Sequence, residues 1–348
     1  MGKRLRHCVQ YASRAFSWGP AMSGLDRRAF MALGGALVLT DVSAQEHGPT
    51  KLTPPAPSLS LPQSWIKAPR LALWPGAPPG AATFSPQPTP ADAAPVFLQN
   101  VSSPDLHVFR PAHPNGQALL VIPGGAYRFV SVANEGAEVA ARMTPHGVTI
   151  FVLTYRLPGE GWQHRADVPL QDAQRAVRVI RAHARRFAID ADKVSVLGFS
   201  AGGHLAATLV TQHAEETYSD VDEADHLSAR PFAAGLIYPV VTMVSPWTHE
   251  VSRTTLLGEA PSEGEINRRS AELHVNADTP PVFAVHAVDD PAVPVENTLN
   301  FVNAMRIAKR PVEAHLLQEG GHAFGVGYPN TPSALWPELF RTWLNRLA

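Results

Sequence analysis

The feature that most constrains the fold is a lone serine between glycines at the end of an apolar run. Residues 194–206 read VSVLGFSAGGHLA, so a β-branched segment passes through G-F-S-A-G, centred on Ser200, into a segment that favours helix. Flanking glycines let a strand turn sharply into a helix while the serine is held in a strained conformation with its hydroxyl exposed. Ser200 is therefore a candidate nucleophile at the carboxyl edge of a sheet. The alternative is a serine that only caps the helix.

The sequence around this turn alternates short apolar runs with segments of helical periodicity. Between residues 169 and 190, apolar Leu170, Ala173, Val177 and Ile180 recur at intervals of three and four. Strands are predicted at 118–125, 148–157, 193–200, 232–241, 280–290 and 312–322, and helices at 135–147, 169–190, 201–213, 295–309 and 335–347. This alternation predicts an α/β fold with a mostly parallel central sheet and helices on both faces.

The N-terminus has the pattern of a targeting segment. Arg27 and Arg28 precede the apolar run AFMALGGALVLT (29–40), and small residues follow up to Ala44. This pattern resembles a twin-arginine export signal. The apolar run has 12 residues, which is too short for a membrane span, since a span needs about 20. We expect residues 1–44 to be this signal and the protein to be exported by a bacterium, to the periplasm or beyond, without stable membrane insertion. An uncleaved anchor is the alternative. Met22 marks residues 1–21 as a possible mis-assigned start.

A proline-rich stretch follows the signal, since 13 of the 33 prolines fall between residues 49 and 95. Such a composition cannot sustain helix and suits an extended tether. We predict a linker at 45–70 and a single catalytic domain at 71–348. The only cysteine, Cys8, lies before the predicted cleavage site, so the mature chain is expected to have neither a disulfide nor a thiol nucleophile.

Composition narrows the classes of partner. The formal net charge is −1 and the pI is near 7.0, so no basic field is present that would hold nucleic acid. The 15 histidines are scattered, without the His and Cys spacing of a zinc site. We therefore predict a site without metal or cofactor. Nothing in the sequence sets the oligomeric state.

A serine nucleophile needs a base, and the base needs a carboxylate to orient it. Asp289 and Asp290 end the predicted strand at 280–290, and His322 stands among glycines directly after the last strand, in EGGHAFG. We assign Ser200, His322 and Asp290 as the catalytic residues, with Asp289 as the alternative carboxylate. His204 and His286 are expected to pack beside them in structural roles.

Acyl transfer also needs hydrogen-bond donors for the oxyanion, which backbone amides in a tight turn provide. The sequence PGGAY (123–127) follows the predicted strand at 118–125. We predict that the amides of Gly125 and Ala126, with that of Ala201 after the nucleophile, form the oxyanion hole. A plain turn is the alternative.

These motifs together resemble the α/β-hydrolase superfamily, and within it exported bacterial acetylesterases and acetyl xylan esterase-like proteins. The segments that carry the resemblance are LWPGAPPG (73–80), VIPGGAY (121–127), GFSAGGHLA (198–206), LIYPVV (236–241), SRTTLLGE (252–259), residues 272–297 and GGHAFG (320–325). The resemblance covers about residue 71 to the C-terminus and implies the α/β-hydrolase fold with the chain order Ser, Asp, His. Ala126 and Ala323 stand where the family usually has glycine, so we expect a narrower pocket.

The resemblance implies a serine esterase. The expected activity is removal of O-acetyl groups from plant polysaccharide or oligosaccharide, with a general carboxylesterase as the alternative and a serine peptidase or a non-catalytic binding protein as lesser ones. Tyr127, Trp247 and Arg253 are candidate contacts for the acetylated carbohydrate or small-molecule ester. Equally, Trp247 could belong to the core and Arg253 to a surface salt bridge.

Overall fold

The computed structural model describes residues 59–91 and 93–347. The predicted export signal at 1–44 and the first part of the predicted linker lie outside the described residues. Within the described ranges, no helix combines the length and the hydropathy that a bilayer span requires.

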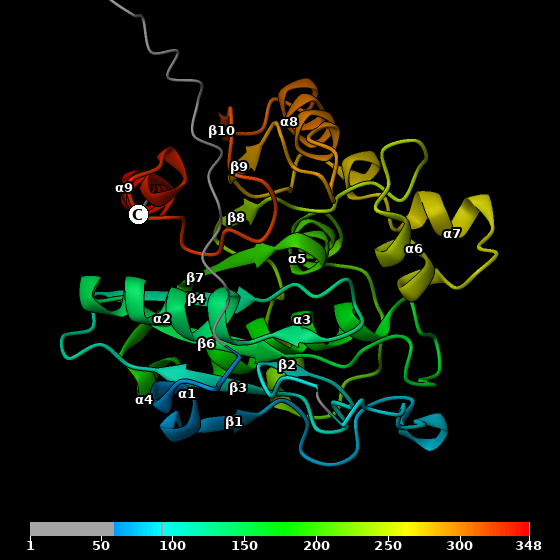
Figure 1. Cartoon of the computed structure of the whole chain (residues 1–348). Coiled ribbons are helices and arrows are strands. Elements are labelled where there is room, and N and C mark those ends of the chain that lie inside the picture. The colour runs from blue at the N-terminus through cyan, green and yellow to red at the C-terminus, as the bar shows by residue number, and fades with distance from the viewer. Residues whose placement is uncertain (1–58, 92, 348) are drawn as a thin grey trace, which may run out of the picture. The chain divides into compact units, whose positions relative to one another are not determined.

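The described chain is built on an eight-stranded sheet with the order β1-β3-β6-β4-β7-β8-β9-β10 (Figure 1). The six strands from β6 to β10 in this order run parallel, and β3 pairs antiparallel with both β1 and β6. Their bounds are β1 Arg70–Ala72, β3 Asp105–Phe109, β4 Gly116–Ile122, β6 Thr149–Thr154, β7 Ile189–Phe199, β8 Ala234–Ile237, β9 Val282–Ala287 and β10 Val312–Leu317. A separate pair joins β2 (Phe97–Leu98) to β5 (Val130–Ser131).

All six parallel strands match predicted runs, whereas β1 and β3 were not predicted. In β3 the apolar residues alternate with Asp105 and His107, so the segment lacks the continuous apolar run that marks most of the parallel strands. The central strands bury both faces: Leu119 to Ile122 of β4 and Val196 and Leu197 of β7 are fully buried. Strands covered on both sides show this pattern because neither face meets water.

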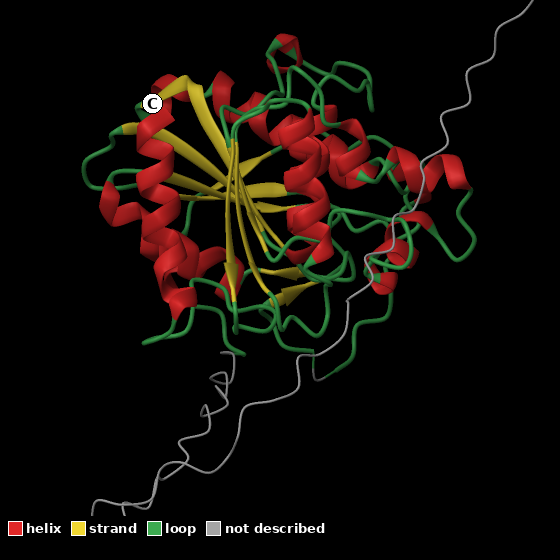
Figure 2. Cartoon of the chain, turned by 90° about the horizontal axis from the view of Figure 1, so that it is seen from above, coloured by secondary structure: helices red, strands yellow, loops and turns green. Residues whose placement is uncertain are grey.

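Helices cover both faces of the sheet, which Figure 2 shows edge-on between two groups of helices. This confirms the predicted α/β-hydrolase architecture. The α-helices are α1 Gln63–Lys67, α2 Glu138–Met143, α3 Val168–Ala182, α4 Ala184–Phe187, α5 Ser200–Gln212, α6 Glu250–Leu257, α7 Glu263–Arg268, α8 Glu296–Ile307 and α9 Trp336–Leu347. Shorter turns are η1 Ala81–Thr83, the π-helical η2 Ala133–Ala137, η3 Thr144–His146, η4 Glu223–His226, η5 Ala271–His274 and η6 Pro332–Leu335.

The domain begins earlier than predicted, so the linker boundary at residue 70 is wrong. Helix α1 places Trp65 in the core at 4% exposure, where its ring stacks on His107 at 3.7 Å. Strand β1 then pairs with β3, with Arg70 opposite His107. One buried aromatic side chain supplies enough apolar contact to fix a short segment. The linker was predicted from its proline content, which gives no information on such a contact.

Candidate active site

Ser200 lies at the junction of β7 and α5 with a φ of +51°. A positive φ is strained for a residue with a side chain and persists only where the surroundings enforce it. The two neighbouring glycines make this possible through close packing. A Cβ on Gly198 would lie 2.3 Å from the Gly202 carbonyl oxygen, and one on Gly202 would lie 2.2 Å from the Ile122 carbonyl oxygen. The glycines of G-F-S-A-G thus let helix α5 approach β4 and β7 directly.

The structure brings Ser200, His322 and Asp290 together from the ends of three strands. His322 Nε2 lies 2.9 Å from Ser200 Oγ, and His322 Nδ1 lies 2.6 Å from Asp290 Oδ2. Since a carboxylate only accepts, Nδ1 carries the proton and donates it to Asp290, which leaves Nε2 free to accept from the Ser200 hydroxyl. The Asp290 side chain is fully buried and the His322 side chain is 19% exposed.

Asp290 is held as a carboxylate by several donors. Its Oδ2 also accepts from His286 Nε2 at 3.2 Å, and its Oδ1 accepts from the Ala292 and Val293 amides at 2.8 and 2.9 Å. Burial by itself would raise the pKa of Asp290, but the hydrogen bonds from His286 and His322 lower that pKa well below its usual range. Asp290 therefore remains negatively charged at any pH at which the protein is expected to work.

The neighbouring Asp289 has a different position. Its Oδ1 accepts from the amides of Gly320 and Gly321 at 2.9 and 2.8 Å, so it braces the turn that leads to His322 without contacting the imidazole. Of the two carboxylates considered from the sequence, Asp290 is the one that faces His322.

The turn after β4 leaves two amides free beside the serine. Gly125, Ala126 and Tyr127 all have positive φ, and a Cβ on Gly125 would lie 2.1 Å from the Phe129 carbonyl oxygen. Among the described residues, the Gly125 and Ala126 amides donate no hydrogen bond. Ala201 follows Ser200 in the first turn of α5, where amides have no partner within the helix. The arrangement can therefore offer three N–H groups to a developing negative oxygen.

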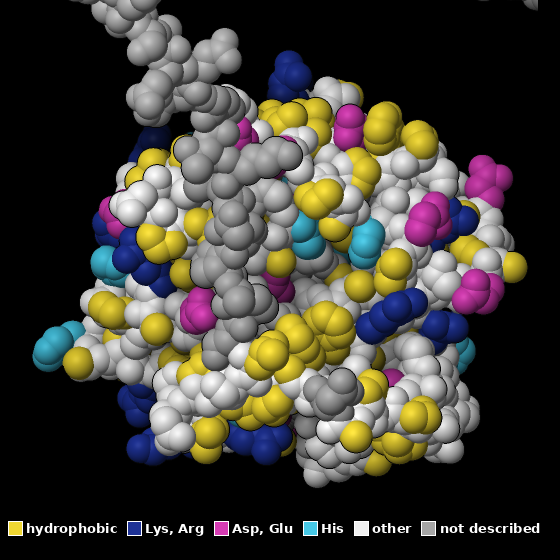
Figure 3. Space-filling model, in the orientation of Figure 1, with side chains coloured by type: hydrophobic (Ala, Val, Ile, Leu, Met, Phe, Trp, Pro, Cys, Tyr) yellow, Lys and Arg dark blue, Asp and Glu magenta, His cyan; other side chains and the backbone are white. Residues whose placement is uncertain are grey.

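A cavity of about 860 Å³ opens beside Ser200 and His322. In Figure 3, hydrophobic side chains gather at the middle of the visible face with histidine and acidic side chains among them. The cavity beside Ser200 has an apolar part, formed by Val96, Phe97, Phe129, Phe324, Val326 and Pro329, and a polar part that includes Ser131, Asn134, Glu135, Glu138, His249 and Tyr328. We call it the Ser200 cavity.

None of the three expected substrate contacts lines the Ser200 cavity, which corrects that prediction. Tyr127 is 1% exposed, and its hydroxyl donates to His204 Nδ1 at 2.7 Å. Trp247 is 41% exposed and so belongs neither to the core nor to the cavity. Arg253 donates to Ser245 Oγ and forms an ion pair with Glu250 at 3.6 Å.

His204 and His286 are both buried. His204 Nε2 donates to the Arg269 carbonyl oxygen at 2.7 Å, and burial lowers the pKa of His204 to about 4. His286 Nδ1 accepts from Thr298 Oγ1 at 2.7 Å. Both rings thus hold loops beside the site through hydrogen bonds at each ring nitrogen.

Two residues at the site were missed from the sequence. His249 lines the Ser200 cavity just before α6, and burial lowers its pKa. Glu135 is 3% exposed beside the amide turn, and burial raises its pKa. A single carboxylate or imidazole has no motif of its own, so only its neighbours in space reveal it.

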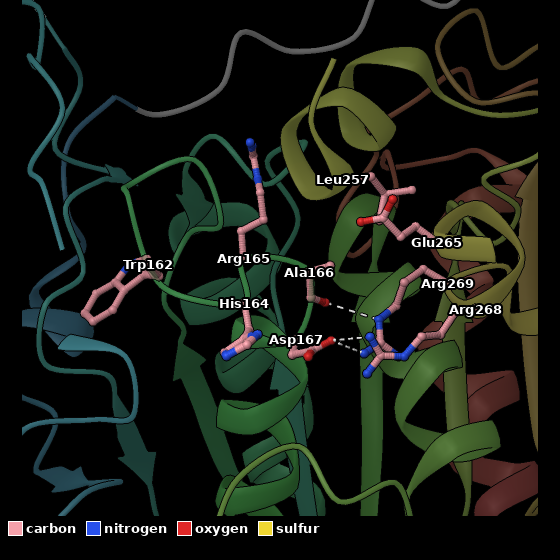
Figure 4. Close-up of a pocket in the computed structure, with 9 residues that line it drawn as sticks. All are labelled: Trp162, His164, Arg165, Ala166, Asp167, Leu257, Glu265, Arg268 and Arg269. Carbon is pink, nitrogen blue, oxygen red and sulfur yellow. Dashed lines mark hydrogen bonds and ion pairs between the residues drawn. The ribbon is translucent and has the colours of Figure 1, made fainter. Parts of the chain in front are cut away.

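A second cavity, of about 380 Å³, lies beside helix α7 and is lined by charged side chains of both signs. Figure 4 shows Arg269 pointing toward Ala166 and Asp167. Asp167 pairs with both Arg268 and Arg269, and Glu215 pairs with the same two arginines. The lining, which lies wholly in the described chain, includes Trp162, His164, Arg165, Leu257 and Glu265 and has no serine, threonine or cysteine. We call it the Arg269 cavity.

A metal site is not apparent in the described ranges, where no group of three or more His, Cys, Asp or Glu side chains could hold a metal ion.

Comparison with known proteins places these features among esterases. The BD-FAE family model matches residues 105–305. The chain is 36% identical to endo-1,4-beta-xylanase B of Butyrivibrio fibrisolvens over 60% of this chain and 32% of that protein. It is 30% identical to the acetylxylan esterase of Xylanibacter ruminicola over 68% of this chain and 48% of that protein. The chain thus spans about a third to a half of the length of these relatives.

A solved structure extends the likeness over most of the described residues. The acetyl ester-xyloside bifunctional hydrolase of Caldicellulosiruptor lactoaceticus superposes with a TM-score of 0.65 at 30% identity, covering 78% of this chain and 97% of that one. The family match includes Ser200 and Asp290 and ends before His322.

Proposed function

The chain belongs to the BD-FAE family, among the acetyl xylan esterase-like α/β-hydrolases, and we propose that it hydrolyses carboxylic esters through Ser200, His322 and Asp290. The observation that carries the proposal is the continuous hydrogen-bonded path from Ser200 Oγ through His322 to buried Asp290, at 2.9 and 2.6 Å. A nucleophile, its base and an orienting carboxylate in contact are the arrangement that activates a serine.

The proposed reaction has two halves. His322 Nε2 takes the Ser200 proton as Oγ attacks the ester carbonyl. The negative oxygen so formed accepts hydrogen bonds from the backbone amides of Gly125, Ala126 and Ala201. Asp290 keeps the Nδ1 proton on His322 and stabilises the imidazolium. The imidazolium protonates the leaving alcohol, and a water molecule then repeats the sequence on the acyl-enzyme to release the acid.

For the substrate, we propose acetyl esters of plant polysaccharide or oligosaccharide. The support is the likeness to an acetylxylan esterase and to an acetyl ester-xyloside hydrolase, each at 30% identity. Such a substrate is extracellular, which agrees with the export that the twin-arginine motif at Arg27 and Arg28 predicts.

A general carboxylesterase is the second candidate, and the size of the Ser200 cavity favours it. The cavity holds about 860 Å³ and has an aromatic part formed by Phe97, Phe129 and Phe324. An acetyl group would fill only a small part of this space, and an apolar lining also suits longer acyl chains or an aromatic group.

The deciding experiment compares p-nitrophenyl acetate, butyrate and octanoate, beside acetate release from acetylated xylan. We expect a preference for acetate together with release from the polymer. A preference for octanoate without acetate release would assign the general carboxylesterase. Ser200→Ala should lower kcat by about 10⁴ to 10⁶ without unfolding the protein, whereas Ser262→Ala, in the cap of α7, should keep full activity. Wild-type turnover in Ser200→Ala would refute the mechanism.

Export is tested separately by cell fractionation. Replacing both Arg27 and Arg28 with lysine should leave the esterase activity in the cytoplasmic fraction, because the twin-arginine pair is the signal that is read. Equal export of this variant and the parent would refute that route.

A further inference from the structure

Glu135 is a buried acid beside the amide turn that has no role in the reaction described so far. It lies in η2, a single π-helical turn, and is 3% exposed while still lining the Ser200 cavity. Within the described residues it forms no ion pair with a lysine or arginine. A buried carboxylate without a cation requires compensating hydrogen bonds, and single π-turns are frequent at functional sites.

Both carboxylate oxygens of Glu135 have a donor. Oε2 accepts from the Gly124 amide at 2.7 Å, directly before the two free amides of the turn. Oε1 accepts from the Tyr238 hydroxyl at 2.8 Å, and the Tyr238 oxygen in turn accepts from the Gly325 amide at 3.1 Å. One carboxylate thus connects the amide turn after β4 with the loop that carries His322.

Tyr238 also touches the catalytic loop through its ring. The ring lies edge-on to His322 at 4.9 Å and to Phe324 at 4.5 Å between centroids. Tyr238 follows β8 with a φ of +37° and is fully buried. A strained and buried residue of this kind persists where its surroundings hold it in one conformation. Tyr238 can therefore fix the position of the loop that carries His322 relative to Glu135.

A proton count favours the ionised form of Glu135. The amides of Gly124 and Gly325 can only donate, so a single proton remains between Glu135 Oε1 and the Tyr238 oxygen. That proton belongs to Tyr238 when Glu135 is a carboxylate. A protonated Glu135 would bring a second proton into the same contact, and one of the two would lose its acceptor.

We propose that Glu135 is a positioning residue of the esterase site: as a buried anion it holds the amide turn through Gly124 and the His322 loop through Tyr238, and its charge favours the imidazolium of His322. The inference rests on the proposed function. Burial raises the pKa of Glu135, while the Gly124 amide, the Tyr238 hydroxyl and a positive charge on His322 lower it. By reciprocity, the Glu135 anion stabilises protonated His322.

Other titratable groups surround His322 and have to stay in place during the test. They are Asp290 after β9, His249 before α6, Tyr238 after β8, and Tyr328 and Glu138 in the Ser200 cavity. Two further groups act at longer range: the charge of Arg128 lowers the pKa of His249, and the charge of Glu135 raises the pKa of Tyr155. A substitution at Glu135 leaves these side chains in the protein, although it removes a charge that raises the pKa of Tyr155 and Tyr238.

The test measures kcat and the pH dependence of kcat/KM with p-nitrophenyl acetate for Glu135→Gln and Tyr238→Phe. Glu135→Gln should lower kcat about 10- to 100-fold, somewhat less than the loss of an oxyanion donor. It should also move the acid limb of the profile to lower pH by about half a unit or more, because the anion that favours imidazolium is gone. Tyr238→Phe removes one of the two donors to Glu135 but keeps the carboxyl group and its Gly124 contact, so it should lower kcat and move the acid limb less than Glu135→Gln does.

Glu160→Gln is the matched control. Glu160 is also 3% exposed, and burial raises its pKa, but its Oε1 accepts from the Asn100 amide away from the Ser200 cavity. Its kcat and acid limb should equal those of the wild type. Wild-type kcat and acid limb in Glu135→Gln, or equal losses in Glu135→Gln and Glu160→Gln, would overturn the inference.

Two further results keep the test decisive. If Glu135→Gln does not fold, Glu135→Asp and Tyr238→Phe replace it, and wild-type kcat in both refutes the positioning role. If the wild type itself shows no Ser200-dependent hydrolysis, the proposed function fails. An active wild type with an unaffected Glu135→Gln refutes only the role of Glu135.

Discussion

The Ser200 cavity and the Arg269 cavity both contain charged side chains, but they use them in opposite ways. Around Arg269, Arg268 and Arg269 face two carboxylates, Asp167 and Glu215, and each of these four charges has an opposite partner in contact. Around Ser200, the Asp290 carboxylate has no arginine or lysine. It is balanced by two histidines and two backbone amides.

The difference shows what marks a reactive site. Paired charges lower each other's energy and leave none of the paired groups free to react. The ion pairs of the Arg269 cavity instead connect the end of α7 with the loop before α3. At Ser200, a hydroxyl, an imidazole nitrogen and two amides are held in place with capacity left for a substrate. Groups that are fixed but unsatisfied are the ones that can stabilise a transition state.

The largest expected effect separates the two adjacent carboxylates of the Ser200 site. Asp290→Asn should lower kcat by about 10⁴, because the amide no longer selects the Nδ1–H form of His322. Asp289→Asn should cost far less, since Asp289 contacts only the Gly320 and Gly321 amides. Steady-state kinetics on both variants check this. Equal losses would mean that Asp289 shares the orienting role.

Removing the central charge of the other cavity should affect stability and spare the chemistry. Arg269 is 1% exposed, and Arg269→Met leaves Asp167 and Glu215 short of one partner. We expect a loss of about 3 to 5 kcal/mol in the free energy of unfolding, toward the lower value because both carboxylates are partly exposed. Urea unfolding measures it. A large fall in kcat of the folded variant would contradict the contrast between the cavities.

A pH effect on stability links the two regions through His204, whose ring joins Tyr127 to the Arg269 carbonyl. Its folded pKa of about 4 lies below the ordinary 6.5, so the unfolded chain binds the proton first. His204 therefore costs no stability above pH 6.5, and stability falls as the pH drops toward 4, by about 3 kcal/mol in all. His204→Gln should remove this part of the slope. Identical slopes in urea titrations of both proteins would count against it.

The smallest effect tests the corrected position of Tyr127. Tyr127→Phe removes the hydrogen bond to His204, which should cost about 1 kcal/mol of stability. The ratio of kcat/KM for octanoate over acetate should stay constant, because Tyr127 does not line the Ser200 cavity. Phe129→Ala, in the cavity wall, should change that ratio. A changed ratio in Tyr127→Phe would restore it as a substrate contact.

Much of the fold could be predicted because its signals are local. Most of the parallel strands contain continuous apolar runs, and the turn at Ser200 is marked by glycines two residues to either side. Strand β3 and helix α1 could not be found this way. The first alternates polar and apolar residues although four of its five residues are buried, and the second is fixed by Trp65 against His107, 42 positions along the chain.

The sequence by itself determined the residue types of the site and their order along the chain: a serine between glycines, then paired aspartates, then a histidine among glycines. Only the tertiary structure decided which aspartate faces His322, that Tyr127 turns into the core, and that Glu135 reaches the amide turn. These outcomes depend on burial and on hydrogen-bond partners up to 77 residues apart. A side chain's neighbours in sequence fix its backbone, but its neighbours in space fix its partners and its charge.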